Sequence, residues 1–448
     1  MTHKYPLAKG TVVIRGGAVL TPTGLIDADV VVVDGVIAAV EPNAAVPEGA
    51  TVLDAQGCIT GPGFVDLHTH LREPGKEQAE TIASGARAAA LGGYTAVVAM
   101  PNTSPCLDSA FVVRAVLDLG AQTTTEVAVA GAITVGRAGE QLAPIAELAA
   151  LGVQLFTDDG TGVQHGGVAR RALDYCTGLG VTYAEHCEDL AIASGGVVHE
   201  GAWSAKLGLP GQPASAEEAM VARDLLLAGE LGARIHLLHL STVGSVELVR
   251  AAKAKGIAVT AEAAPHHFTL TDAEIASYDA RFKVNPPLRP DEHVAAIIEG
   301  LCDGTIDAIA TDHAPHTPET KDLPFDEAPP GMLGLETAFS LAYERLVEGA
   351  GMPMEHLFDL LSTNPARIAE LDAAGDRPYG HTAHGARVAP GIPANLVVVD
   401  PSARWTVAGT ALASLATNTP YEGRSMHGSV RHTILRGEPV VISGEAQR

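Results

Sequence analysis

The central part of the chain alternates between short apolar runs and Ala/Leu-rich stretches, and this alternation constrains the fold most. Over about residues 60–375, eight strand-like runs are separated by helix-like stretches such as AETIASGARAAALGG and SAEEAMVARDLLLAGELG. Eight strand–helix units in succession are the signature of a (β/α)₈ barrel, which typically needs ~250 residues and more with insertions. We therefore expect an α/β protein with a (β/α)₈ TIM barrel over residues 61–375.

The two ends of the chain differ from this central part. Residues 11–59 contain short runs rich in β-branched residues and Gly-containing turns, without a helical period. The C-terminal runs ANLVVVD, ARWTV and VRHTILRGEPVVI have the same character. We expect residues 1–60 and 376–448 to join in one small β domain beside the barrel.

The chain is acidic and apolar enough to bury a large core. Its 448 residues are 46% hydrophobic and carry a formal net charge of −24. No block of Lys and Arg stands out, which argues against nucleic acid or an anionic membrane as a partner. No apolar run approaches the ~18 residues of a membrane span, and the N-terminus lacks a secretory pattern. Five cysteines without a CxxC pair disfavour a disulfide framework, so a reducing, cytoplasmic location is expected.

Five of the strand-like runs stop at His or Asp. They are GFVDLHTH (His68, His70), VQLFTDD (Asp158, Asp159), VTYAEH (His186), IHLLHLS (His239) and IDAIATDH (Asp312). Active sites of (β/α)₈ barrels lie at the C-terminal ends of the strands, so these side chains should converge. Imidazoles and carboxylates in this number suit one or two divalent metal ions. The sequence therefore favours chemistry by a water molecule that a metal ion activates.

The roles of these residues are defined to different degrees. His68 and His70 are two residues apart on a strand, so both imidazoles face the same side. Of the adjacent Asp158 and Asp159, one is expected to ligate and the other to cap the turn, and the residues alone leave the choice open. Asp312 fits a metal ligand, a general base or both.

Three further residues suggest an anionic substrate. Arg72 and Asn102 follow the first two strand ends, and His316 lies in a Pro-rich loop, residues 313–334, after the eighth strand. Arg commonly binds carboxylates because its guanidinium donates two parallel hydrogen bonds. We expect these residues to hold a carboxylate and the loop to act as an active-site lid.

Several segments are specific enough to be compared with known families: DLHTHLREPG (66–75), ATDHAPHTPETK (310–321), MPNTSP (100–105), LGLPGQPASAEEA (207–219), AEAAPHHFTLT (261–271) and KVNPPLR (283–289). Together they resemble the dihydroorotases of the amidohydrolase superfamily, over nearly the whole chain. The resemblance is greatest to the bacterial type that works alongside aspartate transcarbamoylase.

This resemblance implies a distorted barrel, a β-sandwich made from both termini, and two zinc ions per subunit. The metal ligands that it implies are His68 and His70 for one ion, His186 and His239 for the other, Asp159 as the bridge, and Asp312. It also implies that Asp312 is the general acid and base. The substrate-binding residues that it implies are His70, Arg72, Asn102, Asn285, His316, Pro330 and Gly331.

The reaction that the resemblance implies is the reversible cyclisation of N-carbamoyl-L-aspartate to L-dihydroorotate, with release of water, in de novo pyrimidine biosynthesis. A homodimer and a complex with aspartate transcarbamoylase are further expectations. In the lid, Pro330 stands where the family usually has an aromatic residue. Because Pro330 has no N–H, a substrate contact there must use its carbonyl group or the Gly331 N–H.

Two alternatives are open at this point. The first is another cyclic amidase, acting on a hydantoin-, dihydropyrimidine- or allantoin-like ring. Such enzymes look similar but carry a carboxylated lysine after the fourth strand, whereas residues 152–160 contain no Lys. Arg72 and Asn102 also argue against it, because those rings lack a carboxylate. The second is a catalytically silent subunit that supports transcarbamoylase assembly, which the complete set of ligand residues disfavours.

Overall fold

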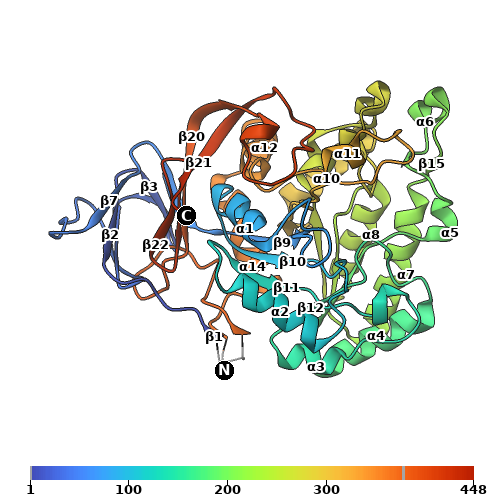
Figure 1. Cartoon of the computed structure of the whole chain (residues 1–448), viewed down its shortest axis with the longest axis horizontal. Helices are drawn as coiled ribbons and strands as arrows, with labels where there is room; N and C mark the ends of the chain where they lie inside the picture. The colour runs from blue at the N-terminus through green and yellow to red at the C-terminus, as the bar shows by residue number, and fades with distance from the viewer. Residues whose placement is uncertain (1–2, 376–378) are drawn as a thin grey trace.

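The computed structural model describes residues 3–375 and 379–448. In Figure 1 a strand-rich body on the left adjoins a larger body on the right, where helices surround the inner strands. Strands from both terminal parts of the chain, residues 11–62 and 396–446, form the strand-rich body, and the alternating elements form the larger one.

The larger body is a closed barrel of parallel strands. Its strands, in the order in which they pair, are β9 (Phe64–Thr69), β10 (Tyr94–Ala99), β11 (Glu126–Val129), β12 (Leu155–Phe156), β13 (Thr182–Glu185), β16 (Ile235–Leu237), β17 (Val259–Ala263) and β18 (Ala308–Ile309). Isolated parallel bridges join β11 to β12 (Gly131–Phe156) and the end of β9 to the end of β18 (Thr69–His313). Within the described residues, these eight strands confirm the (β/α)₈ barrel that the alternation predicts.

The apolar strands are explained by burial on both faces. Every residue of β9 and of β10 is buried, as expected for parallel strands that helices cover. Val65, Ala96, Leu155, Ala184 and Ala308 belong to one cluster although they come from five strands. Residues of well-separated strands can share contacts only across the barrel, so this cluster fills its interior.

The helices of the barrel begin and end at residues suited to capping. Thr81 precedes α1 (Ile82–Leu91): its hydroxyl accepts from the Ser84 N–H, and the Ser84 hydroxyl accepts from the Thr81 N–H. α4 (Gly166–Leu179) ends at Gly180, whose φ of 71° is left-handed. The remaining helices between the strands are α2 (Ala110–Gly120), η1 (Val135–Arg137), α3 (Ile145–Ala150), α7 (Ser215–Leu231), α8 (Val243–Ala254) and α10 (Asp291–Asp303).

Helices also follow the last barrel strand. They are α11 (Pro318–Lys321), α12 (Ala338–Ala342), η4 (Tyr343–Glu348), α13 (Met354–Phe358), η5 (Asp359–Thr363) and α14 (Asn364–Ile368). Of these, α11 lies inside the loop of residues 313–334. No helix of the described residues is long and apolar enough to cross a membrane.

The Gly and Pro residues of segments 188–213 and 268–290 predict loops, but both segments contain short elements. The first holds α5 (Leu190–Ala193), β14 (Val198–His199), α6 (Ala202–Leu207) and β15 (Gly211–Gln212). The second holds the end of α9 (Pro265–Thr269), η2 (Asp272–Ser277) and η3 (Ala280–Phe282). A shared apolar cluster explains them: Val198 of the first segment packs with Ile275 and Ala280 of the second and with Phe325 of the lid loop. Such tertiary contacts stabilise elements that are too short to form alone.

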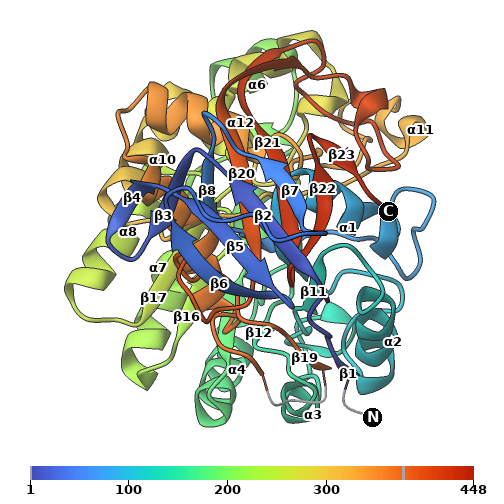
Figure 2. The same ribbon diagram turned by 90° about the vertical axis from the view of Figure 1, so that its left-hand side faces the viewer.

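The strand-rich body consists of two sheets built from both ends of the chain. One sheet contains β6 (Val36–Glu41), β5 (Asp29–Val33), β2 (Thr11–Arg15) and β7 (Thr51–Asp54), and the other contains β23 (Glu445–Ala446), β22 (Glu438–Ile442), β21 (Ser425–Leu435), β20 (Leu396–Thr406), β8 (Ile59–Pro62), β3 (Ala18–Thr21) and β4 (Gly24–Asp27). Figure 2 shows the blue N-terminal sheet in front of the red C-terminal strands. Val30 and Val32 of the first sheet pack with Leu396 and Val398 of the second, so the two ends form one β-sandwich.

The limits of this β domain stay predictions. β1 (His3–Lys4) pairs with β19 (Tyr379–Gly380) apart from both sheets. The expected start of the second β segment, at residue 376, lies outside the described residues.

A long connection between β20 and β21 reaches from the β domain to the barrel. It spans residues 407–424, includes η6 (Gly409–Ala411), and extends beside α12 in Figure 1. Val407 and Tyr421 of this connection pack with Met332, near the end of the lid loop. The C-terminal part of the chain therefore contacts the mouth of the barrel as well as completing the sandwich.

Candidate active site

Four histidines and two aspartates meet at the C-terminal ends of the barrel strands. His68, His70 and Asp159 form one group that could hold a metal ion, and Asp159, His186 and His239 form a second. In each group the candidate ligand atoms lie within 4.8 Å of one another, and all these residues are buried. Because the two groups share Asp159, the arrangement suits two ions with one bridging carboxylate.

The distances around Asp159 support this arrangement. Its Oδ1 lies 3.4 Å from His68 Nε2 and 3.6 Å from both His186 Nδ1 and His239 Nε2. Its Oδ2 lies 3.6 Å from His70 Nε2. Oδ1 of Asp159 thus faces imidazole nitrogens from the ends of three different strands, and Oδ2 faces the imidazole of His70.

Asp312 lies beside the first of the two groups. Its Oδ1 lies 3.1 Å from His70 Nε2 and 3.5 Å from His68 Nε2. It follows β18, and its φ of 46° is unusual for a residue with a side chain. His239 and Arg72, with φ of 30° and 61°, share this strained backbone, which clusters at functional sites.

Neighbouring polar groups hold the outer nitrogens of three of these histidines. Glu262 lies 3.0 Å from His68 Nδ1, Glu188 lies 3.0 Å from His186 Nε2, and the Asn102 carbonyl oxygen lies 2.9 Å from His70 Nδ1. Because these partners accept hydrogen bonds, they place the ring proton on the outer nitrogen and leave the inner nitrogen as a donor to metal. Glu262 also accepts from His236 Nε2 at 3.0 Å.

One buried atom tests directly whether a metal fits. His68 Nε2 has no hydrogen-bond partner among the described residues, although its ring is fully buried. An unpaired buried nitrogen is costly, and coordination of a metal ion would satisfy it. The donor set of imidazoles and carboxylates also suits zinc and similar divalent ions, so the residues present fit a metal centre.

Electrostatics point to the same conclusion. Burial would raise the pKa of both carboxyls, but His68, His186 and His239 hold the pKa of Asp159 well below its usual range. His70 and His68 likewise hold the pKa of Asp312 below its usual range. Burial opposes protonation of His186, yet the carboxylates of Asp159 and Glu188 raise the pKa of His186 to about 10. The ionised carboxylates therefore require positive charge beside them, which metal ions would supply in place of ring protons.

The structure separates the two adjacent aspartates. Asp158 Oδ1 accepts from the backbone N–H groups of Ile133 (2.9 Å) and Thr134 (3.0 Å), and its Oδ2 accepts from the Thr134 hydroxyl. Asp158 thus binds the segment after β11, whereas Asp159 faces the histidines. The Asp158 side chain therefore binds residues 133 and 134 instead of capping the turn that follows it, and Asp159 is the one of the pair whose carboxylate lies among the histidines.

Arg72 and His316 lie together beside the metal groups. Arg72 is 8% exposed, donates from Nε to the Pro315 carbonyl at 3.1 Å, and has Nη2 3.3 Å from His316 Nε2. Burial lowers the pKa of Arg72 to about 10, which still leaves it charged at neutral pH. Among the described residues its side-chain hydrogen bonds go to a carbonyl group and a histidine, and a buried guanidinium of this kind is suited to binding an anion.

The other residues expected to bind substrate already have protein partners. Asn285 Nδ2 donates to Glu188 Oε2 at 2.6 Å, and Asn102 Nδ2 donates to Asp159 Oδ2 at 3.1 Å. In the lid loop, His316 Nε2 lies 2.9 Å from the Pro330 carbonyl oxygen. The Gly331 N–H donates to the Lys283 carbonyl at 2.9 Å. Both groups considered for ring recognition in the lid are therefore engaged within the protein.

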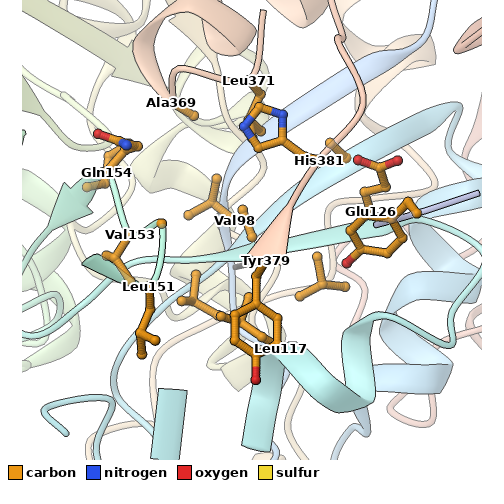
Figure 3. Close-up of a pocket in the computed structure, with 17 residues that line it drawn as sticks. Val98, Leu117, Glu126, Leu151, Val153, Gln154, Ala369, Leu371, Tyr379 and His381 are labelled. Atoms are coloured by element: carbon orange, nitrogen blue, oxygen red, sulfur yellow. The ribbon is translucent and has the colours of Figure 1, made fainter. Parts of the chain in front are cut away.

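A cavity at the opposite end of the barrel is not part of this site. Figure 3 shows its lining, which includes Leu117, Glu126, Gln154, Tyr379 and His381. Glu126 is the first residue of β11, so the cavity adjoins the N-terminal ends of the strands. Its volume of about 40 Å³ has room for a few water molecules and not for a substrate.

Comparisons with known proteins agree with this geometry. A family model described as dihydro-orotase-like matches residues 57–245. The chain is 47% identical to a dihydroorotase of Pelotomaculum thermopropionicum, over 96% of this chain and 98% of the relative. The dihydroorotase of Mycobacterium tuberculosis is 48% identical, over 93% and 95% of the two chains. This chain belongs to the dihydroorotase family.

Solved structures extend the comparison of the fold. An L-hydantoinase from Arthrobacter aurescens superposes with a TM-score of 0.86 at 24% identity, covering 98% of this chain and 97% of that one. At this identity the likeness concerns the fold alone. The dihydroorotase family and the two groups of His and Asp together indicate a metal centre in this chain.

Proposed function

We propose that this protein is a dihydroorotase that interconverts N-carbamoyl-L-aspartate and L-dihydroorotate in pyrimidine biosynthesis. The observation that carries the proposal is Asp159 shared between two histidine groups, with the Arg72 guanidinium beside them. Relatives named dihydroorotase, 47% and 48% identical over nearly their full length, support it.

The metal centre would hold two zinc ions per subunit. His68 and His70 would bind one, His186 and His239 the other, and Asp159 would bridge them, with Asp312 as a further ligand. Bound zinc supplies Lewis acidity and lowers the pKa of water to near neutral. The outer partners of the histidines, Glu262 and Glu188, would keep the rings oriented toward the ions.

Asp312 would move the proton in this reaction. In the hydrolytic direction its carboxylate takes the proton of the attacking water and passes it to the ring nitrogen as the amide C–N bond breaks. In the cyclisation direction the same carboxyl group reverses both transfers. Asp312 is 5% exposed, so bulk water does not compete for this proton.

The substrate carboxylate would bind Arg72, Asn102 and His316. One N–H of the Asn102 amide donates to Asp159, and its second N–H is left for the substrate. His70 would contact the substrate as well as the metal. Asn285, Pro330 and Gly331 would lie around the ring.

Turnover of two related rings tests the proposed function. We expect purified protein to hydrolyse L-dihydroorotate, followed by absorbance, with about two metal ions bound per chain. Dihydrouracil, which lacks the carboxylate, should be hydrolysed at least ~10-fold less efficiently, because the site's charged donors are then left unpaired. A preference for dihydrouracil would instead indicate a hydantoinase-like amidase. Absence of both metal and turnover would indicate a silent subunit.

Replacement of Arg72 tests carboxylate recognition. Arg72→Ala should raise the KM for L-dihydroorotate ~10- to 100-fold, since a hydrogen bond to a charged group contributes ~1.5–3 kcal/mol. Arg72→Lys keeps the positive charge but cannot donate two parallel hydrogen bonds, so its KM should lie between those of Arg72→Ala and the wild type. Arg114→Ala, an exposed change on α2, is the control. An unchanged KM in Arg72→Ala would contradict the assignment.

Location and assembly complete the proposal. We infer a cytoplasmic enzyme from the reduced cysteines, all five of which are free. A homodimer and a complex with aspartate transcarbamoylase are proposed from the family alone.

A further inference from the structure

The connection between β20 and β21 places one buried amide against the lid loop. Asn418, in residues 407–424, is 3% exposed. Its side-chain Oδ1 accepts from the His316 N–H at 3.0 Å. Its Nδ2 donates to the carbonyl oxygens of Ala314 and Gly331, both at 3.1 Å.

These contacts define the orientation of the amide without ambiguity. A backbone N–H can only donate and a backbone carbonyl can only accept, so Oδ1 must face His316 and Nδ2 must face Ala314 and Gly331. The backbone carbonyl of Asn418 also accepts from the Leu333 N–H at 3.3 Å. Asn418 therefore joins the first segment of the loop, residues 314–316, to its last segment, residues 331–333.

Other contacts hold the two strands of the loop together. The Ala314 N–H donates to the Met332 carbonyl at 2.8 Å, and Lys321 Nζ donates to the Pro329 carbonyl at 2.9 Å. Asn418 differs from these because it comes from another part of the chain. It connects the loop to the segment of residues 407–424. That segment is itself held to α9 by a 2.9 Å hydrogen bond between the hydroxyl groups of Tyr421 and Thr269.

The loop residues that Asn418 binds are those beside the anion site. His316 faces Arg72 and the Pro330 carbonyl, and Gly331 follows Pro330 directly. A Cβ on Gly331 would lie 2.9 Å from His316 Nε2, so the backbone at 331 and the His316 ring are packed tightly. A shift of either strand of the loop would move the His316 ring relative to Arg72.

We propose that Asn418 is a positioning residue that fixes the loop of residues 313–334 and sets the affinity for the substrate carboxylate. The proposal rests on the proposed function for the identity of that substrate. In this proposal the loop holds one fixed position beside the site, because Asn418 from the C-terminal part of the chain binds it. The loop is then not a lid that opens freely. Because Asn418 contacts neither metal groups nor reacting atoms, it should act on KM and leave the chemical step intact.

Replacement of Asn418 tests this with two independent readouts. In Asn418→Ala, we expect the KM for L-dihydroorotate to rise ~10-fold or more with kcat within about threefold, because three buried backbone groups lose their partner. Asn418→Asp should be affected at least as strongly, since it presents oxygen to two carbonyls. Hydrogen exchange should accelerate in the peptides covering 313–334, with the peptides of β10 and α1 unchanged. Thr410→Ala, an exposed change in the same connection, should match the wild type in both readouts.

Each outcome decides the matter. Unchanged KM and unchanged exchange in Asn418→Ala overturn the proposal, and so does an equal rise in exchange throughout the protein, which marks a general folding defect. If Asn418→Ala does not fold, Asn418→Ser, which keeps one short acceptor, should show the same local effects more weakly, and a wild-type KM would overturn the idea. If the wild-type protein does not hydrolyse L-dihydroorotate, the proposed function fails. The role of Asn418 in fixing the loop is then tested by hydrogen exchange of residues 313–334 alone, compared between Asn418→Ala and the wild type.

Discussion

Asp312→Asn is expected to lower the turnover of L-dihydroorotate by ~10²- to 10⁴-fold, the range that general acid–base catalysis contributes. The amide has nearly the shape of the carboxylate but cannot accept the proton of the attacking water. Its oxygen can still lie near His70 Nε2, where the Asp312 oxygen is 3.1 Å away. Turnover should therefore fall much more than substrate affinity, and steady-state kinetics with metal analysis of the same sample would measure both.

The matched control is Asp322→Asn. Asp322 is exposed at the end of α11, in the same loop region, and contacts neither the metal groups nor Arg72 in the described structure. It should retain wild-type turnover. If Asp312→Asn keeps two ions per chain and more than one-tenth of wild-type turnover, another group moves the proton.

The fold follows from local patterns to a large extent. Buried parallel strands need continuous apolar runs, and helices between them need an apolar face, so the alternation alone predicts the barrel. The lack of helical periodicity at both ends predicts one small β domain, whereas its form as a sandwich is implied only by the resemblance to dihydroorotases. The short elements in residues 188–213 and 268–290 could not be predicted, because contacts such as those of Val198 with Ile275 and Phe325 stabilise them.

The residues of the site divide in the same way. Side chains at strand ends converge in any (β/α)₈ barrel, which is why His186 and His239 could be named without a structure. Glu262 also lies on a barrel strand, where a carboxylate among apolar neighbours indicates a polar partner inside the barrel. Glu188 and Asn418 gave no comparable signal, because their partners are set by how loops fold against each other. The choice between Asp158 and Asp159 likewise depends on side-chain direction, which a turn sequence does not determine.

Replacement of these two aspartates separates catalysis from stability. Asp159→Ala removes the carboxylate that both metal groups share, so we expect fewer than two ions per chain and a fall in turnover of ~10³-fold or more. Metal content by elemental analysis and turnover on the same sample would check this. Thermal stability is a weaker readout for this variant, because loss of bound metal also lowers it.

Asp158→Ala should have the opposite signature. It leaves the N–H groups of Ile133 and Thr134 and the Thr134 hydroxyl without their acceptor, which costs ~1–3 kcal/mol of the free energy of unfolding. Two ions should still bind, and turnover at low temperature should stay within a few-fold of the wild type. The pair of variants is informative because the residues are adjacent, equally charged and both buried. If Asp158→Ala loses metal while Asp159→Ala keeps it, the bridging role has been assigned to the wrong carboxylate. Asp159 would then not connect the ion near His68 to the ion near His186.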